Sequence, residues 1–214
     1  MRLILIRHAE TDGNKTHYVG REDLPLNATG RAQAEALARA LARDGIDRVL
    51  SSPLQRARAT AAPLAAMHAL AVEVRAGLVE IDYGELQGLA KGARPFKLRK
   101  AFLTTPMPGG ESLADVWRRL TPIAEELKAL VAAGTVPAVV GHYWSNRMLF
   151  AMLGGGDLES ALGKGGVKPA NASAYAVEFA VLSGQPIAVA SKLLHAPAGA
   201  RRRNSATDQK ATGS

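Results

Sequence analysis

Cysteine is absent from the 214 residues of the chain. The sequence therefore has no disulfide framework, no thiolate nucleophile and no cysteine-ligated zinc site. The absence favours a reducing compartment, and we expect a cytoplasmic protein. Any nucleophile must come from another residue type.

Aromatic residues make up only 5% of the chain, which leaves few side chains for stacking on nucleic-acid bases. The formal charge is nonetheless +8, from 27 Lys and Arg against 19 Asp and Glu. A positive charge of this size suits the binding of nucleic acids and of anionic small molecules equally well. The sequence, however, has no zinc-finger spacing and no aromatic-rich sheet signature. We expect no nucleic-acid partner, and a salt-sensitive nucleic-acid binder is the rival hypothesis.

Long apolar runs are also missing. The apolar run near the N-terminus, Leu3 to Ile6, is too short for the core of a signal peptide. The longest stretch without Asp, Glu, Lys or Arg extends from Ala129 to Asn146. It contains Gly134 and Pro137, which suit a helix end and a strand better than a membrane span. The sequence predicts no membrane partner.

Short apolar segments alternate with amphipathic ones along most of the chain. The patterns predict strands at 3–6, 48–51, 71–75, 136–141, 175–180 and 187–191, and helices at 29–44, 54–66, 113–133 and 145–153. A capping box from Ser112 to Asp115 opens the third helix, and Ser52 and Pro53 are expected as N-cap and first residue of the second. The alternation predicts an α/β fold, a three-layer α/β/α sandwich with a mostly parallel central sheet.

The length fits one domain or at most two. We expect one folded domain over residues 1–197. Residues 198–214 show no periodicity and include Arg201, Arg202 and Arg203, which predicts a disordered basic C-terminal tail.

Charged or imidazole side chains follow three of the predicted strands. Arg7 and His8 follow the first strand, Arg56 lies in the first helical turn after the second, and His142 follows the strand at 136–141. Functional groups collect at the carboxyl ends of strands in open α/β sheets. We therefore expect these four side chains to converge.

Two imidazoles and two guanidinium groups suit phosphoryl transfer. Imidazole is a competent nucleophile near neutral pH because part of it is uncharged around its ordinary pKa of ~6.5. Arginine binds phosphate oxygens through a planar fork and keeps its charge, and the helix N-terminus at Arg56 adds backbone N–H groups. The reaction also needs a proton for the departing oxygen.

The segment from Arg7 to Thr11, Arg-His-Ala-Glu-Thr, resembles the Arg-His-Gly-Glu-Thr signature of the histidine phosphatase superfamily, in its phosphoglycerate mutase-like branch. Four further segments match the family in the right order, so that the resemblance runs from residue 1 to about 190. They are Asp23-Leu24-Pro25-Leu26 with Gly30, Ser51 to Ala57, Leu78 to Gly84, and Gly109-Gly110-Glu111-Ser112. Five ordered matches are far more specific than any one of them.

The resemblance implies the two residues that carry the chemistry. His8 would be the nucleophile that takes the phosphoryl group. Glu80 would protonate the leaving alcohol and then activate water against the phosphohistidine. It implies no metal and no other cofactor, because guanidinium and imidazole groups supply the positive charge.

The resemblance also implies the residues that bind the substrate phosphate. Arg7, Arg56 and His142 would form its cage, and Asn14 would be an accessory contact. Tyr143, next to His142, is expected to contact the substrate as well.

Two departures from the family pattern bear on the pocket. Ala9 stands where the family has Gly, which would disturb the backbone if a positive φ were required there. Tyr143 and Trp144 follow His142 where the family usually has Gly-Gly. Two large rings beside the phosphate are expected to narrow or reshape the pocket, and the alternative is that both are core residues.

The sequence thus predicts a metal-independent phosphatase that hydrolyses small phosphomonoesters through a phosphohistidine on His8. The alternatives are a phosphoglycerate mutase-type phosphoryl transfer and a catalytically impaired binding member of the family. The short segment between Gly88 and Gly109 favours hydrolysis, because the family's mutases carry a longer insertion there. The expected partner is a small phosphorylated substrate, and a homodimer is left open.

Overall fold

The computed structural model describes residues 1–13, 16–90, 101–163, 167–182 and 184–197. Within these ranges six strands form one sheet in the order β3-β2-β4-β1-β5-β6. The strands are β1 (Arg2–Arg7), β2 (Arg48–Ser51), β3 (Val72–Val74), β4 (Pro137–Gly141), β5 (Ala174–Leu182) and β6 (Gln185–His195). The first four in sheet order pair in parallel, and β5 and β6 join antiparallel at the β1 side. The predicted mostly parallel sheet is confirmed.

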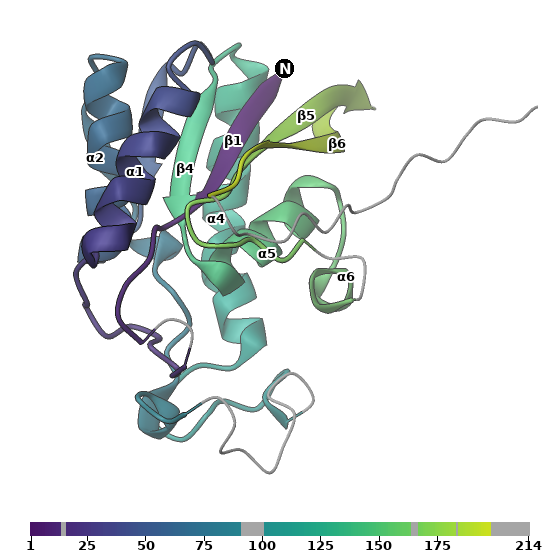
Figure 1. Ribbon diagram of the computed structural model, residues 1–214. Helices are drawn as coiled ribbons and strands as arrows, with labels where there is room; N and C mark the ends of the chain where they lie inside the picture. The colour runs from purple at the N-terminus through teal and green to yellow at the C-terminus, as the bar shows by residue number, and fades with distance from the viewer. Residues whose placement is uncertain (14–15, 91–100, 164–166, 183, 198–214) are drawn as a thin grey trace, which may run out of the picture.

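Helices cover both faces of this sheet (Figure 1). On one side lie α1 (Ala28–Ala40) and α2 (Gln55–Met67), and on the other lie α4 (Leu113–Ala132) and α5 (Tyr143–Leu153), followed by the short α6 (Leu158–Leu162). Short 3₁₀ turns at Ala76–Leu78 and Gly84–Leu86 lie in the connection between β3 and α4. The predicted three-layer α/β/α sandwich is confirmed.

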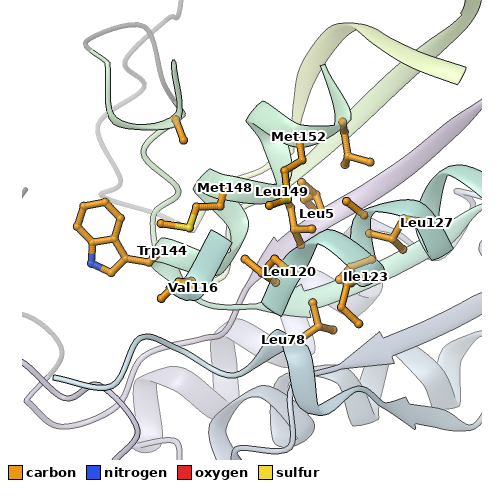
Figure 2. Close-up of a cluster of buried hydrophobic side chains, with 14 of the residues drawn as sticks. Leu5, Leu78, Val116, Leu120, Ile123, Leu127, Trp144, Met148, Leu149 and Met152 are labelled. Carbon is orange, nitrogen blue, oxygen red and sulfur yellow. The ribbon is translucent and has the colours of Figure 1, made fainter. Parts of the chain in front are cut away.

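The central strand β1 explains why the first apolar run has no polar alternation. Ile4 and Ile6 pack with the helices α1 and α2, while Leu3 and Leu5 pack with α4 and α5. All four side chains are at most 1% exposed. A strand buried on both faces is apolar at every position. Figure 2 shows Leu5 facing side chains of α4 and α5 in the second of these clusters.

The start of α4 follows its sequence signal. The Ser112 hydroxyl accepts a hydrogen bond from Asp115 N, and the Asp115 carboxylate accepts one from Ser112 N at 3.0 Å, which is the predicted capping box. The hydroxyl and N–H of Ser112 stabilise the ionised carboxylate and lower the pKa of Asp115 to about 2. The cap also fixes the chain that leads into α4.

The predicted start of α2 is wrong. The helix begins at Gln55 with Leu54 in the N-cap position, and that cap makes no side-chain hydrogen bond. Ser52 directly follows β2 and stays bound to the neighbouring strand β4, because its N–H donates to Val140 O at 3.0 Å. Its hydroxyl lies 2.8 Å from a ring nitrogen of His142, so a polar contact at the sheet edge holds the predicted cap residue outside the helix.

Across the described ranges, no helix combines the length and the apolar character needed to cross a bilayer. The predicted tail, 198–214, lies outside the described residues. The division into one domain over 1–197 and a tail therefore stays a prediction.

Candidate active site

Three strand ends meet at one point of the sheet edge. Arg7 and Gly141 are register partners at the ends of β1 and β4, and His8 N donates to Gly141 O at 2.9 Å. His142 is the next residue along from Gly141. The rings of His8 and His142 lie with their centroids 5.0 Å apart, tilted by 55°. The parallel register of β1 and β4 therefore brings the two predicted histidines together.

The ring of His8 is held in one tautomer. Its Nδ1 lies 2.7 Å from the carbonyl oxygen of Ala9, and a carbonyl can only accept, so Nδ1 carries the proton. Nε2 then bears the lone pair whenever the ring is neutral. Burial lowers the pKa of His8 well below 6.5, and the charges of Arg56 and Arg7 lower it further. At neutral pH the ring is uncharged, with Nε2 available as a nucleophile.

His142 is completely buried and is oriented by a hydroxyl group. Its Nε2 lies 2.8 Å from Ser52 Oγ. Burial lowers the pKa of His142 well below 6.5, with Arg56 and His8 as further causes. Sequence reasoning missed this role of Ser52 and interpreted the residue as a helix cap.

Two arginines flank the histidines, Arg56 fully buried and Arg7 partly buried. Arg56 is 1% exposed and donates to Gly20 O at 2.6 Å and to Glu22 O at 2.5 Å. Arg7 donates to Pro169 O at 2.9 Å. Burial lowers the pKa of both arginines, that of Arg56 to about 10. A guanidinium group nevertheless keeps its charge at neutral pH. Buried charges of this kind favour an anion beside them.

Glu80 lies where α5 begins. The side chain is 7% exposed, and its carboxylate accepts hydrogen bonds from the N–H groups of Ile81 at 2.9 Å, Tyr143 at 3.0 Å and Trp144 at 3.2 Å. Tyr143 and Trp144 are the first two residues of α5. The helix was predicted from Ser145, and its earlier start brings these two N–H groups to the carboxylate, where the helix dipole also favours negative charge.

The rings of Tyr143 and Trp144 have different surroundings. Trp144 is buried in the core cluster of α4 and α5, and its indole N–H donates to the Tyr83 hydroxyl at 3.0 Å. Tyr143 is half-buried, and the guanidinium carbons of Arg7 and Arg147 lie over its ring at 5.4 Å and 5.6 Å from the centroid. Trp144 is thus a core residue, and Tyr143 contacts a predicted phosphate ligand.

Ala9 fits its position without strain. It is not among the residues with positive φ, so the missing glycine costs no backbone energy there. Its N–H donates to Thr60 Oγ1 at 2.9 Å, and that hydroxyl donates to Arg56 O at 2.7 Å. Thr60 lies one helical turn after Arg56, a spacing that could have drawn attention to it. Asn171, which donates to His8 O at 3.1 Å, gave no sequence signal.

Five of the predicted site residues therefore lie together at the sheet edge: Arg7, His8, Arg56, Glu80 and His142. Asn14 lies outside the described residues. Among the residues that the structure covers, no group of three or more His, Cys, Asp or Glu side chains is placed to hold a metal ion.

Comparison with known proteins gives a consistent set of matches. The family model of the histidine phosphatase superfamily (branch 1) matches residues 3–185. Phosphoserine phosphatase 1 of Hydrogenobacter thermophilus is 34% identical over 166 residues, which cover 74% of this chain and 78% of that protein. A 2,3-bisphosphoglycerate-dependent phosphoglycerate mutase of Methylocella silvestris is 33% identical over 165 residues, or 71% of this chain and 80% of that protein.

Mycobacterial proteins are similar as well. The solved structure of glucosyl-3-phosphoglycerate phosphatase Rv2419c in complex with VO3 has a TM-score of 0.75 and 30% identity, and the match covers 90% of this chain and 96% of that one. The bifunctional protein Rv2228c of Mycobacterium tuberculosis is 41% identical over 160 residues, which cover 71% of this chain and only 43% of that protein.

The electrostatics of the two histidines are testable in the free protein. We expect His8 and His142 to titrate well below pH 6.5 in an NMR titration of their ring protons. Arg56→Met keeps the bulk but removes a positive charge, so the pKa of both rings should rise. The matched control is Arg118→Met, which removes an exposed charge on α4. Titration of both rings at or above 6.5 in the unmodified protein would contradict the burial argument.

Proposed function

The chain belongs to the histidine phosphatase superfamily, and we propose that it hydrolyses small phosphomonoesters through a phosphohistidine on His8. Its relatives include phosphatases and a phosphoglycerate mutase, so it is an enzyme of phosphatase or mutase type. One observation carries the proposal most strongly. The hydrogen bond from His8 Nδ1 to Ala9 O leaves a lone pair on Nε2 of a neutral ring, near the positive charges of Arg56 and Arg7.

In the first step, the Nε2 lone pair of His8 attacks phosphorus while the bond from phosphorus to the ester oxygen breaks. The leaving oxygen takes a proton from the carboxyl group of Glu80 and departs as an alcohol. Arg7, Arg56 and His142 stabilise the charge that spreads over the remaining phosphate oxygens. Because the protein holds these three side chains in fixed positions, they need little reorganisation during the reaction.

In the second step, water attacks the phosphohistidine. The Glu80 carboxylate takes a proton from that water, the bond between phosphorus and Nε2 breaks, and inorganic phosphate forms. The N–H groups of Tyr143 and Trp144 hold the carboxylate in place for this proton transfer. Glu80 thus acts first as acid and then as base. Giving up its proton in the first step leaves it as the carboxylate that the second step needs.

The substrate is proposed as the monoester of a small alcohol. The names of the phosphatase relatives point to phosphoserine and to glucosyl-3-phosphoglycerate, both of which are small hydrophilic phosphomonoesters. A mutase remains the second candidate, because a phosphoglycerate mutase matches over a similar share of the chain. The cytoplasmic location and the homodimer stay predictions.

The division of labour between His8 and Glu80 gives the central test. His8→Ala removes the phosphoryl acceptor and should abolish turnover. Glu80→Gln keeps the nucleophile and the cage but removes the proton donor, so kcat/KM for an alkyl phosphate should fall by about 10²–10⁴. An aryl phosphate with a good leaving group needs little protonation, and its kcat/KM should fall much less.

The phosphoenzyme provides the second readout of the same experiment. With Glu80→Gln, phosphohistidine should accumulate because its hydrolysis lacks a base, and an alkaline quench should preserve it on the peptide that contains His8. Equal losses on both substrates with no trapped phosphate would mean that another residue is the acid. Asp82 or Glu85 in the same loop would then be examined.

Hydrolysis and mutase activity differ in their products. A phosphoglycerate incubated with the purified protein in EDTA should yield mainly free phosphate, measured against isomer formation by NMR. Isomer interconversion with little phosphate release would establish the mutase alternative. Loss of activity in EDTA that a divalent ion restores would instead indicate a metallophosphatase.

Tyr143 tests how Arg7 is oriented. Tyr143→Leu removes the ring under the Arg7 guanidinium, whereas Tyr143→Phe keeps it. A cation–π contact of this kind corresponds to about 2- to 30-fold in binding. We expect the inhibition constant of orthovanadate to rise by that factor in Tyr143→Leu and to change little in Tyr143→Phe. Equal effects of the two substitutions, in variants of equal thermal stability, would exclude a role for the ring.

A further inference from the structure

The motif Gly109-Gly110-Glu111-Ser112 takes no part in the reaction proposed above. Ser112 caps α4, and the other three residues have no role so far. The Glu111 carboxylate nevertheless accepts several charged hydrogen bonds. Arg119 donates to its two oxygens from Nε at 2.9 Å and from Nη2 at 3.1 Å, and Arg21 donates at 2.7 Å. The side chains of Glu111 and Arg119 are 17% and 19% exposed, so their ion pair is largely shielded from water, whereas Arg21 is more exposed.

The same two arginines hold the backbone of Glu80. Arg119 Nη2 donates to Glu80 O at 3.1 Å, and Arg21 Nε donates to that oxygen at 3.3 Å. Arg119 Nη1 also donates to Gly77 O at 2.7 Å and to Val79 O at 2.8 Å. A rigid guanidinium fork whose other donors are fixed by a carboxylate therefore holds the chain directly before Glu80.

Glu111 also holds the chain on the other side of Glu80. Its carboxylate accepts from Asp82 N at 3.1 Å, and its own N–H donates to Asp82 O at 3.0 Å. A Cβ on Gly110 would lie 2.6 Å from Asp82 O, so only glycine allows the two segments to approach this closely. The glycine before Glu111 is thus explained by the packing of the motif on the Glu80 loop.

We propose that Glu111 is a positioning residue for the proton donor of the reaction. Through Arg21, Arg119 and the backbone of Asp82, it fixes Glu80 so that the carboxylate stays at the N-terminus of α5. Glu111 contacts no reacting group itself. This inference rests on the proposed function, in which Glu80 acts as acid and base.

The test uses leaving groups, because a residue that acts through the proton donor matters most where protonation is needed. Glu111→Gln keeps the size of the side chain but removes its charge. We expect kcat/KM for an alkyl phosphate to fall by about 10- to 100-fold, the effect of displacing a catalytic group by about 1 Å. For an activated aryl phosphate it should fall by less than about threefold. Orthovanadate inhibition should change little, since the backbone carbonyls that hold Arg56 and Arg7, those of Gly20, Glu22 and Pro169, are not altered by this substitution.

A matched control lies on α4. Glu126 accepts a comparable set of hydrogen bonds from Arg75, at 2.7 to 3.1 Å, but among the described residues neither of these two side chains makes a hydrogen bond to Glu80 or Asp82. Glu126→Gln should lower stability at most, with no dependence of kcat/KM on the leaving group. Arg119→Lys is the second test variant, since lysine keeps the charge but cannot reach three carbonyls and a carboxylate together. It should reproduce the leaving-group pattern of Glu111→Gln.

The double variant Glu80→Gln/Glu111→Gln separates the inference from the function on which it rests. If Glu111 acts through Glu80, the second substitution should add almost nothing to the loss caused by the first. Additive losses, or equal losses on both substrates in Glu111→Gln and Arg119→Lys, would overturn the positioning role while a leaving-group effect in Glu80→Gln alone upheld the function. No leaving-group effect in any variant and no trapped phosphohistidine would overturn both.

Discussion

Two arginine side chains set the main physical constraint on this structure: the partly buried Arg7 at the end of β1 and the buried Arg56 in the first turn of α2. Arg7 and Arg56 keep their charge although burial lowers the pKa of both. A buried charge is tolerated only where hydrogen bonds and opposite charges compensate for lost water. Carbonyl oxygens of Gly20 and Glu22 accept hydrogen bonds from Arg56. The negative charge of Glu80 partly counteracts the lowering of the pKa of both arginines by burial. The loops around the site are arranged to supply this compensation.

The same cations affect the state of the histidines. Burial is the main cause of the lowered pKa of His8 and His142, and the nearby positive charge lowers it further, so both rings share the site in the neutral form. A neutral ring with its proton on Nδ1 offers a lone pair at Nε2, as a nucleophile for phosphorus requires. In the proposed mechanism, the charge that binds the phosphate therefore also helps to keep the nucleophile in its reactive form. Phosphate binding and activation of His8 would then follow from one arrangement of charge.

Sequence patterns predicted the site residues whose positions follow from a neighbouring strand or helix. They did not predict contacts between segments that are distant in the chain. His8 and His142 were predictable because each directly follows an apolar strand, and parallel strands end at the same edge. Glu80 came only from the resemblance to a family, since no periodicity marks it. The bonds of Ser52 to His142 and of Glu111 to Arg21 join segments 90 residues apart, and no local pattern encodes such a pairing. Arg119 was missed for the same reason, because Gly77, Val79 and Glu80, whose carbonyls it binds, lie 39 to 42 residues away in the chain.

The segment around Arg21 connects the two halves of the proposed reaction. Its carbonyl groups, on either side of Arg21, hold the Arg56 guanidinium, and the Arg21 side chain binds both Glu111 and the backbone of Glu80. A shift of this segment would therefore move the phosphate ligand and the proton donor together. In the proposed mechanism, the two groups must keep a fixed distance from each other, and this shared attachment favours that. We expect specificity for the alcohol to come from side chains outside this segment, such as the half-buried Tyr143 beside Arg7.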